Sequence, residues 1–313
     1  MATIVLVHGI AQEQLSSDSL ENEWIPAMAG GVRKAGFSEI ADRLWRNRSE
    51  PRGIDTRMAF YGHLFLRPGQ QGSATEELTV DEDAVAEQLA LAWIERAAAR
   101  SCNRKETRIA EAELAFLHHE IGEEEAGWSD LGRKAVKSLS KLRWFAPFGM
   151  ALAERFAIKS LAQVTRYLTD DSVRSVALQT VLDLTGPDTK VIIGHSLGSV
   201  VAYEAAHRLG HTLPLLVTAG SPLGVDTIIY PRLRPQPPTY PTAVLRWVNV
   251  ADRDDLVAAE PDLTNFFSSG LPSIARFEGA YTVDNGAKPH NVDFYLTKEQ
   301  IGRPVGETLI ASI

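Results

Sequence analysis

The stretch that most constrains the fold runs from Lys190 to His207 and reads KVIIGHSLGSVVAYEAAH. Its first residues, Lys190–Ile193, form a short β-branched run that predicts a strand. The residues that follow the turn, as far as Gly210, have the pattern of a helix. A strand that turns this sharply into a helix is typical of a mostly parallel sheet with helices packed on it.

The turn itself carries a serine in the pattern G-x-S-x-G, formed by Gly194, Ser196 and Gly198. A chain of this length contains the pattern by chance roughly one time in ten, but the strand before it and the helix after it are the context of a nucleophile elbow. Glycines on either side let neighbouring backbone approach, and the helix N-terminus directs unpaired N–H groups at the serine. We therefore predict Ser196 as a nucleophile and the Leu197 N–H as an oxyanion donor; the alternative is a purely structural turn.

The N-terminal segment supplies a second candidate for binding an oxyanion. Thr3–Val7, TIVLV, predicts a buried strand, and His8, Gly9 and Ile10 follow it directly. We predict that the N–H of Ile10, or of a close neighbour in this loop, faces the same oxygen as the Leu197 N–H. His8 is interpreted as structural, because a histidine at a strand end more often fixes a loop than transfers a proton.

Further strands and helices alternate along the chain. Besides a helix over 19–35, strands are predicted at Asp55–Tyr61, Leu213–Thr218, Ala243–Val250 and Ile274–Phe277. This alternation predicts one α/β domain over residues 1–313, with a mostly parallel sheet flanked by helices. Tyr230–Pro241 contains five prolines, so we expect an irregular surface excursion there.

A helical insertion is predicted at about 75–157, before the elbow. Val85, Leu89, Trp93 and Ala97 recur at every fourth position, the pattern of an amphipathic helix. Aromatic residues then gather around Pro147, namely Trp144, Phe145 and Phe148. Two interpretations stay open for these aromatics: they pack the insertion onto the core, or they form a substrate-facing wall or lid.

Composition narrows the function classes. The 313 residues carry a net charge of −8, which argues against a nucleic-acid partner. Cys102 is the single cysteine, so no intramolecular disulfide is possible and a reducing compartment is favoured. The start of the chain lacks a basic segment, and no apolar run approaches the length of a membrane span. We expect a cytoplasmic protein without stable membrane insertion. We also expect no metal site at His118-His119, because adjacent histidines lack the spacing that would place two ligands on one face of a helix.

The sequence resembles the α/β-hydrolase superfamily, in particular its lipase- and esterase-like members. The resemblance covers nearly the whole chain except the helical insertion, and its motifs are VLVHG, GHSLGS, TAGSPLG, WVNVADRDDLVA and PHNVDFYL. It implies an α/β-hydrolase fold with fewer N-terminal strands. It also implies a catalytic triad in the chain order serine, acid, histidine.

That chain order selects the base and the acid. His290 is the only histidine after His211, so the resemblance makes it the base. Related hydrolases carry an aspartate two residues before a valine, as in Asp255-Leu256-Val257, although leucine replaces their proline here. Asp255 is therefore the preferred acid, Asp252 is the alternative, and Asp254 ranks last.

The resemblance implies a serine hydrolase that cleaves a carboxylic ester through an acyl-enzyme, with an acyl or lipid ester as substrate and no metal or organic cofactor. The same triad also serves acyltransferases, thioesterases and amidases. A hypothesis from another class is a catalytically idle scaffold whose insertion binds a protein partner. The oligomeric state is left open.

Overall fold

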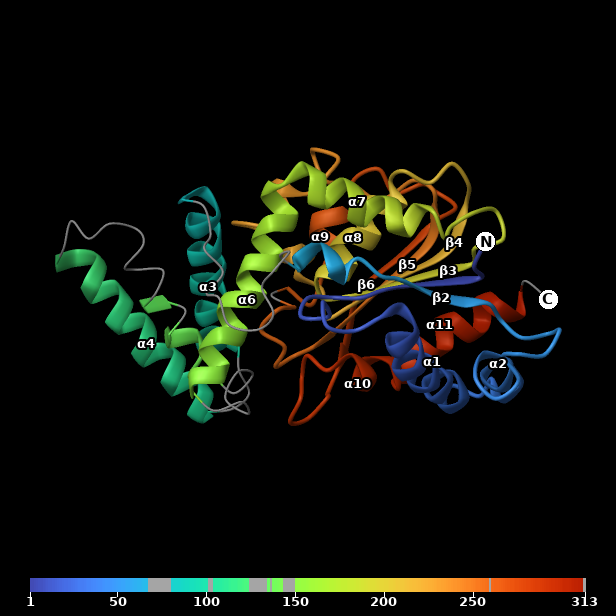
Figure 1. Cartoon of the computed structure of the whole chain (residues 1–313), viewed down its shortest axis with the longest axis horizontal. Coiled ribbons are helices and arrows are strands. Elements are labelled where there is room, and N and C mark those ends of the chain that lie inside the picture. Colours follow the sequence, from blue (N-terminus) through green and yellow to red (C-terminus); the bar gives the residue numbers. More distant parts are fainter. Residues whose placement is uncertain are drawn as a thin grey trace.

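The protein is built on a six-stranded parallel sheet (Figure 1). The computed structural model describes residues 1–66, 80–100, 104–123, 134–135, 137–142, 150–258 and 260–311. The strands are β1 (Ile4–Val7), β2 (Thr56–Ala59), β3 (Val191–His195), β4 (Leu213–Ala219), β5 (Val244–Asp252) and β6 (Arg276–Val283). They lie in the order β2-β1-β3-β4-β5-β6, and each neighbouring pair is parallel. The predicted fold class is confirmed.

The observed strands follow the predicted ones closely, except at the edge of the sheet. The sixth strand was expected at 274–277 but runs from Arg276 to Val283. Most of its residues are exposed or half-buried, and only Gly279 and Val283 are buried. An edge strand with one open face carries no continuous apolar run, so the hydrophobic pattern ends at Phe277 although the backbone continues to pair.

Helices cover both faces of the sheet. One layer contains α1 (Ser17–Lys34), α2 (Ser38–Leu44), α10 (Val292–Leu296) and α11 (Glu299–Ile310), and the other contains α7 (Asp171–Leu182), α8 (Leu197–Ala206) and α9 (Thr264–Phe267). Short 3₁₀ turns lie at η1 (Gly62–Phe65), η3 (Pro222–Gly224) and η4 (Tyr230–Arg232). A hydrophobic core lies on each face of the sheet, and successive side chains of β1 point alternately into the two cores. Ile4 and Leu6 pack with α1, whereas Val5 and Val7 pack with α8. This explains why the strand is apolar throughout.

The chain reverses its direction across the sheet between β1 and β3. From β1 it moves outward to β2, and from β3 it moves the other way through β4 to β6. Right-handed crossovers then require helices on opposite faces, which places α1 and α2 on one side and α8 on the other. Ligands of open α/β sheets bind at the carboxyl ends of strands beside such a reversal. The loops after β1 and β3 are therefore the expected place for a site.

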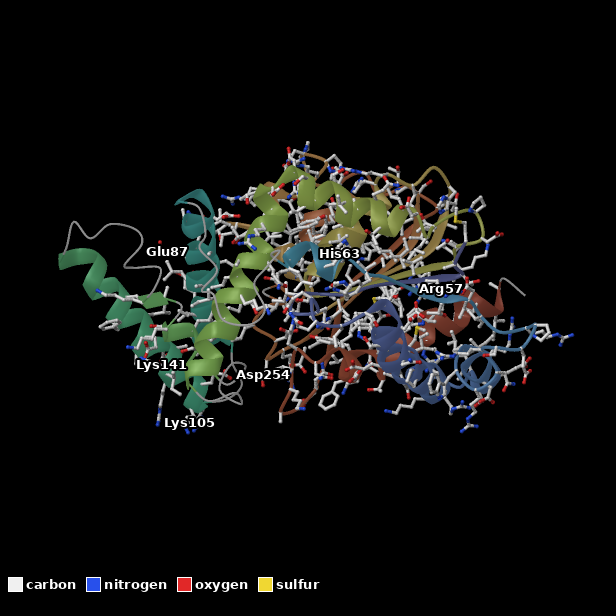
Figure 2. All side chains as sticks on the ribbon, viewed as in Figure 1. Arg57, His63, Glu87, Lys105, Lys141 and Asp254 are labelled. Carbon is white, nitrogen blue, oxygen red and sulfur yellow. The ribbon has the colours of Figure 1, made fainter. Side chains whose placement is uncertain are left out.

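The insertion predicted at about 75–157 contains α3 (Val80–Arg100), α4 (Arg104–Glu123) and the first residues of α6 (Met150–Thr169). These helices stand beside the sheet, and Lys105 and Lys141 lie on the side away from it (Figures 1 and 2). The predicted apolar face of α3 is buried, including Leu89 and Trp93. α6 continues without a break through residue 157, where the insertion was expected to end. Within the described parts of the chain, no helix is long and apolar enough to span a membrane.

A close backbone contact fixes α11 against α1, and it generates the first prediction. A Cβ placed on Gly302 would collide with the backbone of Gly31. We expect Gly302→Ala to lower the free energy of unfolding by about 2–3 kcal/mol, although alanine normally favours a helix. The measurement is urea denaturation, with Gly210→Ala as the matched control, because a Cβ at Gly210 meets open space. The control should change stability by less than about 0.5 kcal/mol. Equal effects of the two variants would contradict this packing.

Candidate active site

The turn between β3 and α8 holds Ser196 in a strained conformation. Its φ of 55° and ψ of −130° lie in a region that non-glycine residues rarely adopt. The Ser196 N–H donates to the Ala219 carbonyl (3.0 Å), and its carbonyl accepts from the N–H of Ser199 (2.9 Å) and lies 2.6 Å from the Ser199 hydroxyl. The serine is 3% exposed. The surrounding bonds therefore hold the strained turn in place.

The glycines predicted to support the elbow are sites of close backbone approach. A Cβ at Gly194 would lie 2.5 Å from the Gly198 carbonyl oxygen, and a Cβ at Gly198 would collide with the carbonyl of Val7. Gly9, in the loop after β1, lies directly against Ser196: a Cβ built on Gly9 would lie 2.8 Å from the Cβ of Ser196. The loop after β1 and the elbow thus touch at the point where the chain reverses across the sheet.

His290 and Asp255 form a contact at the carboxyl end of β5. His290 Nδ1 lies 2.7 Å from Asp255 Oδ2 and 2.9 Å from Oδ1. The carboxylate also accepts the N–H of Val257 at Oδ1 (3.0 Å) and the Tyr295 hydroxyl at Oδ2 (2.8 Å). Burial, together with the Asp255 charge, raises the pKa of Tyr295 well above its usual range, so the hydroxyl keeps its proton and acts as the donor. Asp255 is fully buried, and His290 is 9% exposed.

Asp252, the alternative acid, faces other groups. Its carboxylate accepts the N–H of Asp254 (2.7 Å) and the N–H of Asn285. Burial raises the pKa of Asp252, although these N–H groups oppose part of that effect. Asp254 lies on the loop after β5 and is partly exposed (Figure 2). The structure therefore brings Asp255 to His290, whereas the Asp252 carboxylate contacts the backbone N–H groups of Asp254 and Asn285.

Gly220, which directly follows β4, lies between the elbow and the pair formed by Asp255 and His290. Its φ is +53°, and its N–H donates to Val250. A Cβ there would lie 2.8 Å from Asp255 Oδ2 and 3.2 Å from His290 Nδ1. Glycine is thus required both by the left-handed backbone and by the space that the pair occupies. Since Ala219, the preceding residue, accepts the Ser196 N–H, the pair lies next to the elbow.

His195, the residue before Ser196, packs against His290. The two histidine rings are 4.6 Å apart between centroids. Burial, and then the proximity of His290, hold the pKa of His195 well below its usual range, so the ring is neutral. Among the described residues its Nε2 has no hydrogen-bond partner. His290 therefore packs against a neutral ring on this side.

Two backbone N–H groups are candidates for binding an oxyanion. Leu197 is the first residue of α8, so its N–H has no acceptor within the helix. Every residue of α8 is buried, which keeps this helix end in a dry environment. In the loop after β1, the Ala11 N–H donates to Gln163 Oε1 (2.8 Å). The N–H of Ile10 is then the candidate donor in this loop, as the sequence predicts.

His8 links β1 to the chain that follows β2. Its Nε2 accepts the Tyr61 N–H (3.1 Å), its Nδ1 lies 2.7 Å from the Gly9 carbonyl, and its carbonyl accepts the Tyr61 hydroxyl. Burial lowers the pKa of His8 from 6.5 to about 4. Because Nε2 is an acceptor, the proton of the neutral ring lies on Nδ1 and is donated to Gly9. These contacts assign His8 a structural role.

Three predicted substrate-facing aromatics, Trp144, Phe145 and Phe148, lie outside the described residues. Sequence reasoning missed Tyr295, Gly220 and Gln163 as parts of the site. Gly220 and Tyr295 stand inside the motifs TAGSPLG and PHNVDFYL, which were noted without assigning these residues. No local signal marks Gln163, because its partners in the loop after β1 are some 150 residues away along the chain.

One comparison with known proteins gave a match. The model of the alpha/beta hydrolase family matches residues 157–309. The matched segment contains β3 to β6 together with Ser196, Asp255 and His290, whereas β1 and β2 precede it. No curated protein and no solved structure gives a significant match.

The environment of His8 predicts a pH-dependent stability. Its pKa is depressed in the folded state, so below pH 6.5 the unfolded chain binds the proton more readily, and stability falls as the pH drops toward about 4. We expect the wild type to lose about 2 kcal/mol of unfolding free energy, relative to His8→Gln, between about pH 7.5 and pH 5. The measurement is urea denaturation of both proteins across this range. Parallel stability curves for the two proteins would contradict the assignment.

Proposed function

Because the chain belongs to the α/β-hydrolase superfamily, we propose that it is a serine hydrolase that cleaves a carboxylic ester with Ser196, His290 and Asp255. The observation that carries the proposal is the contact between His290 Nδ1 and the buried Asp255 carboxylate, beside a serine in a strained turn. The neighbouring backbone amides of Leu197 and Ile10 complete the proposed machinery. Trp144, Phe145 and Phe148 remain our proposal for a substrate-facing wall.

In the proposed first half-reaction, Nε2 of His290 takes the proton of the Ser196 hydroxyl as Oγ attacks the carbonyl carbon of the ester. The carbonyl π electrons move to oxygen, and the N–H groups of Leu197 and Ile10 stabilise the resulting oxyanion. When the intermediate collapses, the bond to the alcohol oxygen breaks and His290 returns the proton to that oxygen. The alcohol leaves, and the acyl group stays on Ser196.

In the second half-reaction a water molecule takes the place of the alcohol. His290 removes one of its protons as the water oxygen attacks the acyl carbon, and the same amides hold the second oxyanion. Collapse of this intermediate breaks the bond to Ser196 Oγ, which regains its proton from His290. The carboxylic acid departs and the enzyme returns to its starting state.

Asp255 acts in this proposal without accepting the proton. By holding Nδ1–H of His290 it leaves Nε2 as the basic nitrogen, and its charge stabilises the imidazolium that forms. The Tyr295 hydroxyl and the Val257 N–H donate to the same carboxylate and so favour its ionised form. Burial of all these groups strengthens their electrostatic interactions.

An ester is the preferred substrate because the sequence motifs resemble lipases and esterases. We propose an acyl or lipid ester in particular. Thioester hydrolysis, amide hydrolysis and acyl transfer to an alcohol use the same acyl-enzyme. An activity test must therefore compare esters, thioesters and amides of matched acyl-chain length.

The first test is a panel of p-nitrophenyl esters from acetyl to palmitoyl, with acyl thioesters and anilides beside them. We expect turnover of at least one ester, and Ser196→Ala should lower kcat/KM by at least about 10³-fold, because triad members act as a unit. Ser273→Ala, at an exposed serine, is the matched control and should keep the wild-type rate. Equal rates for wild type and Ser196→Ala would contradict the mechanism, and a folded protein without any turnover would favour the idle scaffold.

The second test separates the two candidate acids. Asp255→Asn should lower kcat by about 10³–10⁴-fold, because the amide cannot hold the required His290 tautomer. Asp252→Asn removes a carboxylate that contacts only backbone N–H groups among the bonds described above, so kcat should stay within about tenfold of wild type. Circular dichroism and thermal unfolding verify that both variants are folded. A severe loss confined to Asp252→Asn would reverse the assignment.

A further inference from the structure

The loop after β1 contains a second strained residue. Ala11 has a φ of 61° and, with Ser196, is one of two non-glycine residues with a positive φ in the described part of the chain. It directly follows Ile10, the candidate oxyanion donor. Alanine has no polar side chain to favour this backbone conformation, so contacts from elsewhere must hold it.

Those contacts come from the part of α6 that follows the predicted insertion. Gln163 of α6 is fully buried, and its amide binds the loop with both ends: Oε1 accepts the Ala11 N–H (2.8 Å), and Nε2 donates to Glu13 Oε2 (2.8 Å). The other oxygen of Glu13 forms an ion pair with Lys159, one turn earlier on α6. Helix α6 therefore holds the loop at two positions, Ala11 and Glu13.

These bonds fix the peptide group next to the candidate donor. The Ala11 N–H belongs to the Ile10–Ala11 peptide, whose carbonyl oxygen accepts the side chain of Gln12 (3.0 Å). A peptide group is planar, so partners at both of its ends fix the orientation of the whole unit. The backbone of Ile10 is then restrained on its C-terminal side, and His8 and Gly9 restrain it on the other.

We propose that Gln163 is a positioning residue, which aligns the Ile10 N–H for the oxyanion by holding the Ala11 peptide. The inference rests on the proposed hydrolase function and extends it: a side chain of α6 completes the oxyanion hole. A merely structural role, in which Gln163 only ties α6 to the loop after β1, has a different consequence. In that case substitution of Gln163 would change the stability of the protein without a selective loss of transition-state binding.

The test compares Gln163→Leu with wild type on the best ester of the panel. Leucine keeps the volume but offers no acceptor to Ala11. We expect kcat to fall by about 10–100-fold and KM to change by less than about threefold, since an oxyanion donor acts mainly in the transition state. Affinity for a trifluoromethyl ketone, which forms a tetrahedral oxyanion adduct with the serine, should fall by a factor similar to that of kcat. Thr165→Val is the matched control, because Thr165 is also buried on α6 and its hydroxyl has no partner among the described residues.

Exchanging the glutamine and the glutamate between positions 163 and 13 tests whether kcat can be restored. Gln163→Glu alone keeps an acceptor for Ala11 but sets two carboxylates against each other, so kcat should fall. Adding Glu13→Gln restores a donor–acceptor pair and the net charge of the group, and kcat should return to within about threefold of wild type. This double variant also tests the proposal if Gln163→Leu fails to fold.

Two results would overturn the positioning role: a Gln163→Leu protein with wild-type kcat and inhibitor affinity, or a stable double variant as impaired as Gln163→Glu. Both are read against an active wild type. A wild type that neither hydrolyses esters nor binds the trifluoromethyl ketone would instead contradict the proposed function, on which the inference rests.

Discussion

Hydrogen bonds between parallel strands bring the loops after β1, β3, β4 and β5 together at the carboxyl ends of the strands, and the rest of the site depends on this pairing. The Ser196 N–H donates to Ala219 at the end of β4, and the Gly220 N–H donates in turn to Val250 of β5. These bonds set the serine beside the space that His290 and Asp255 occupy. A shift of one residue in this register would turn the elbow away from its partners.

The sequence was sufficient to predict those features whose causes are local. A β-branched run before G-x-S-x-G identifies the elbow. The family resemblance selects His290 by chain order and prefers Asp255 over Asp252 by its position two residues before Val257, and the structure brings His290 and Asp255 together. Features that depend on contacts between distant segments were beyond such reasoning. Gln163 contacts Ala11, which lies 152 residues away in the sequence. Most residues of β6 are exposed or half-buried, so a hydrophobic pattern does not reveal the full length of that strand. Tyr295 was visible within a motif, but its bond to Asp255 was not.

Helix α6 meets the sheet at the loop after β1. Strain at Ser196 is held by the elbow itself, whereas strain at Ala11 is held by α6, which the chain reaches only after the insertion. Backbone strain of this kind persists only where surrounding contacts fix it. In our proposal the two strained residues flank the same reacting carbonyl group, so the catalytic geometry depends on both parts of the protein.

Reaction with a fluorophosphonate, followed by mass spectrometry of the intact protein and its peptides, tests most directly whether Ser196 is an activated nucleophile. We expect one phosphonyl group per chain, located on the peptide that contains Ser196, and almost no adduct on a folded His290→Ala variant. A folded wild-type protein that takes up no phosphonyl group, or that carries it on another residue, would contradict the assignment of Ser196, His290 and Asp255 as a catalytic triad.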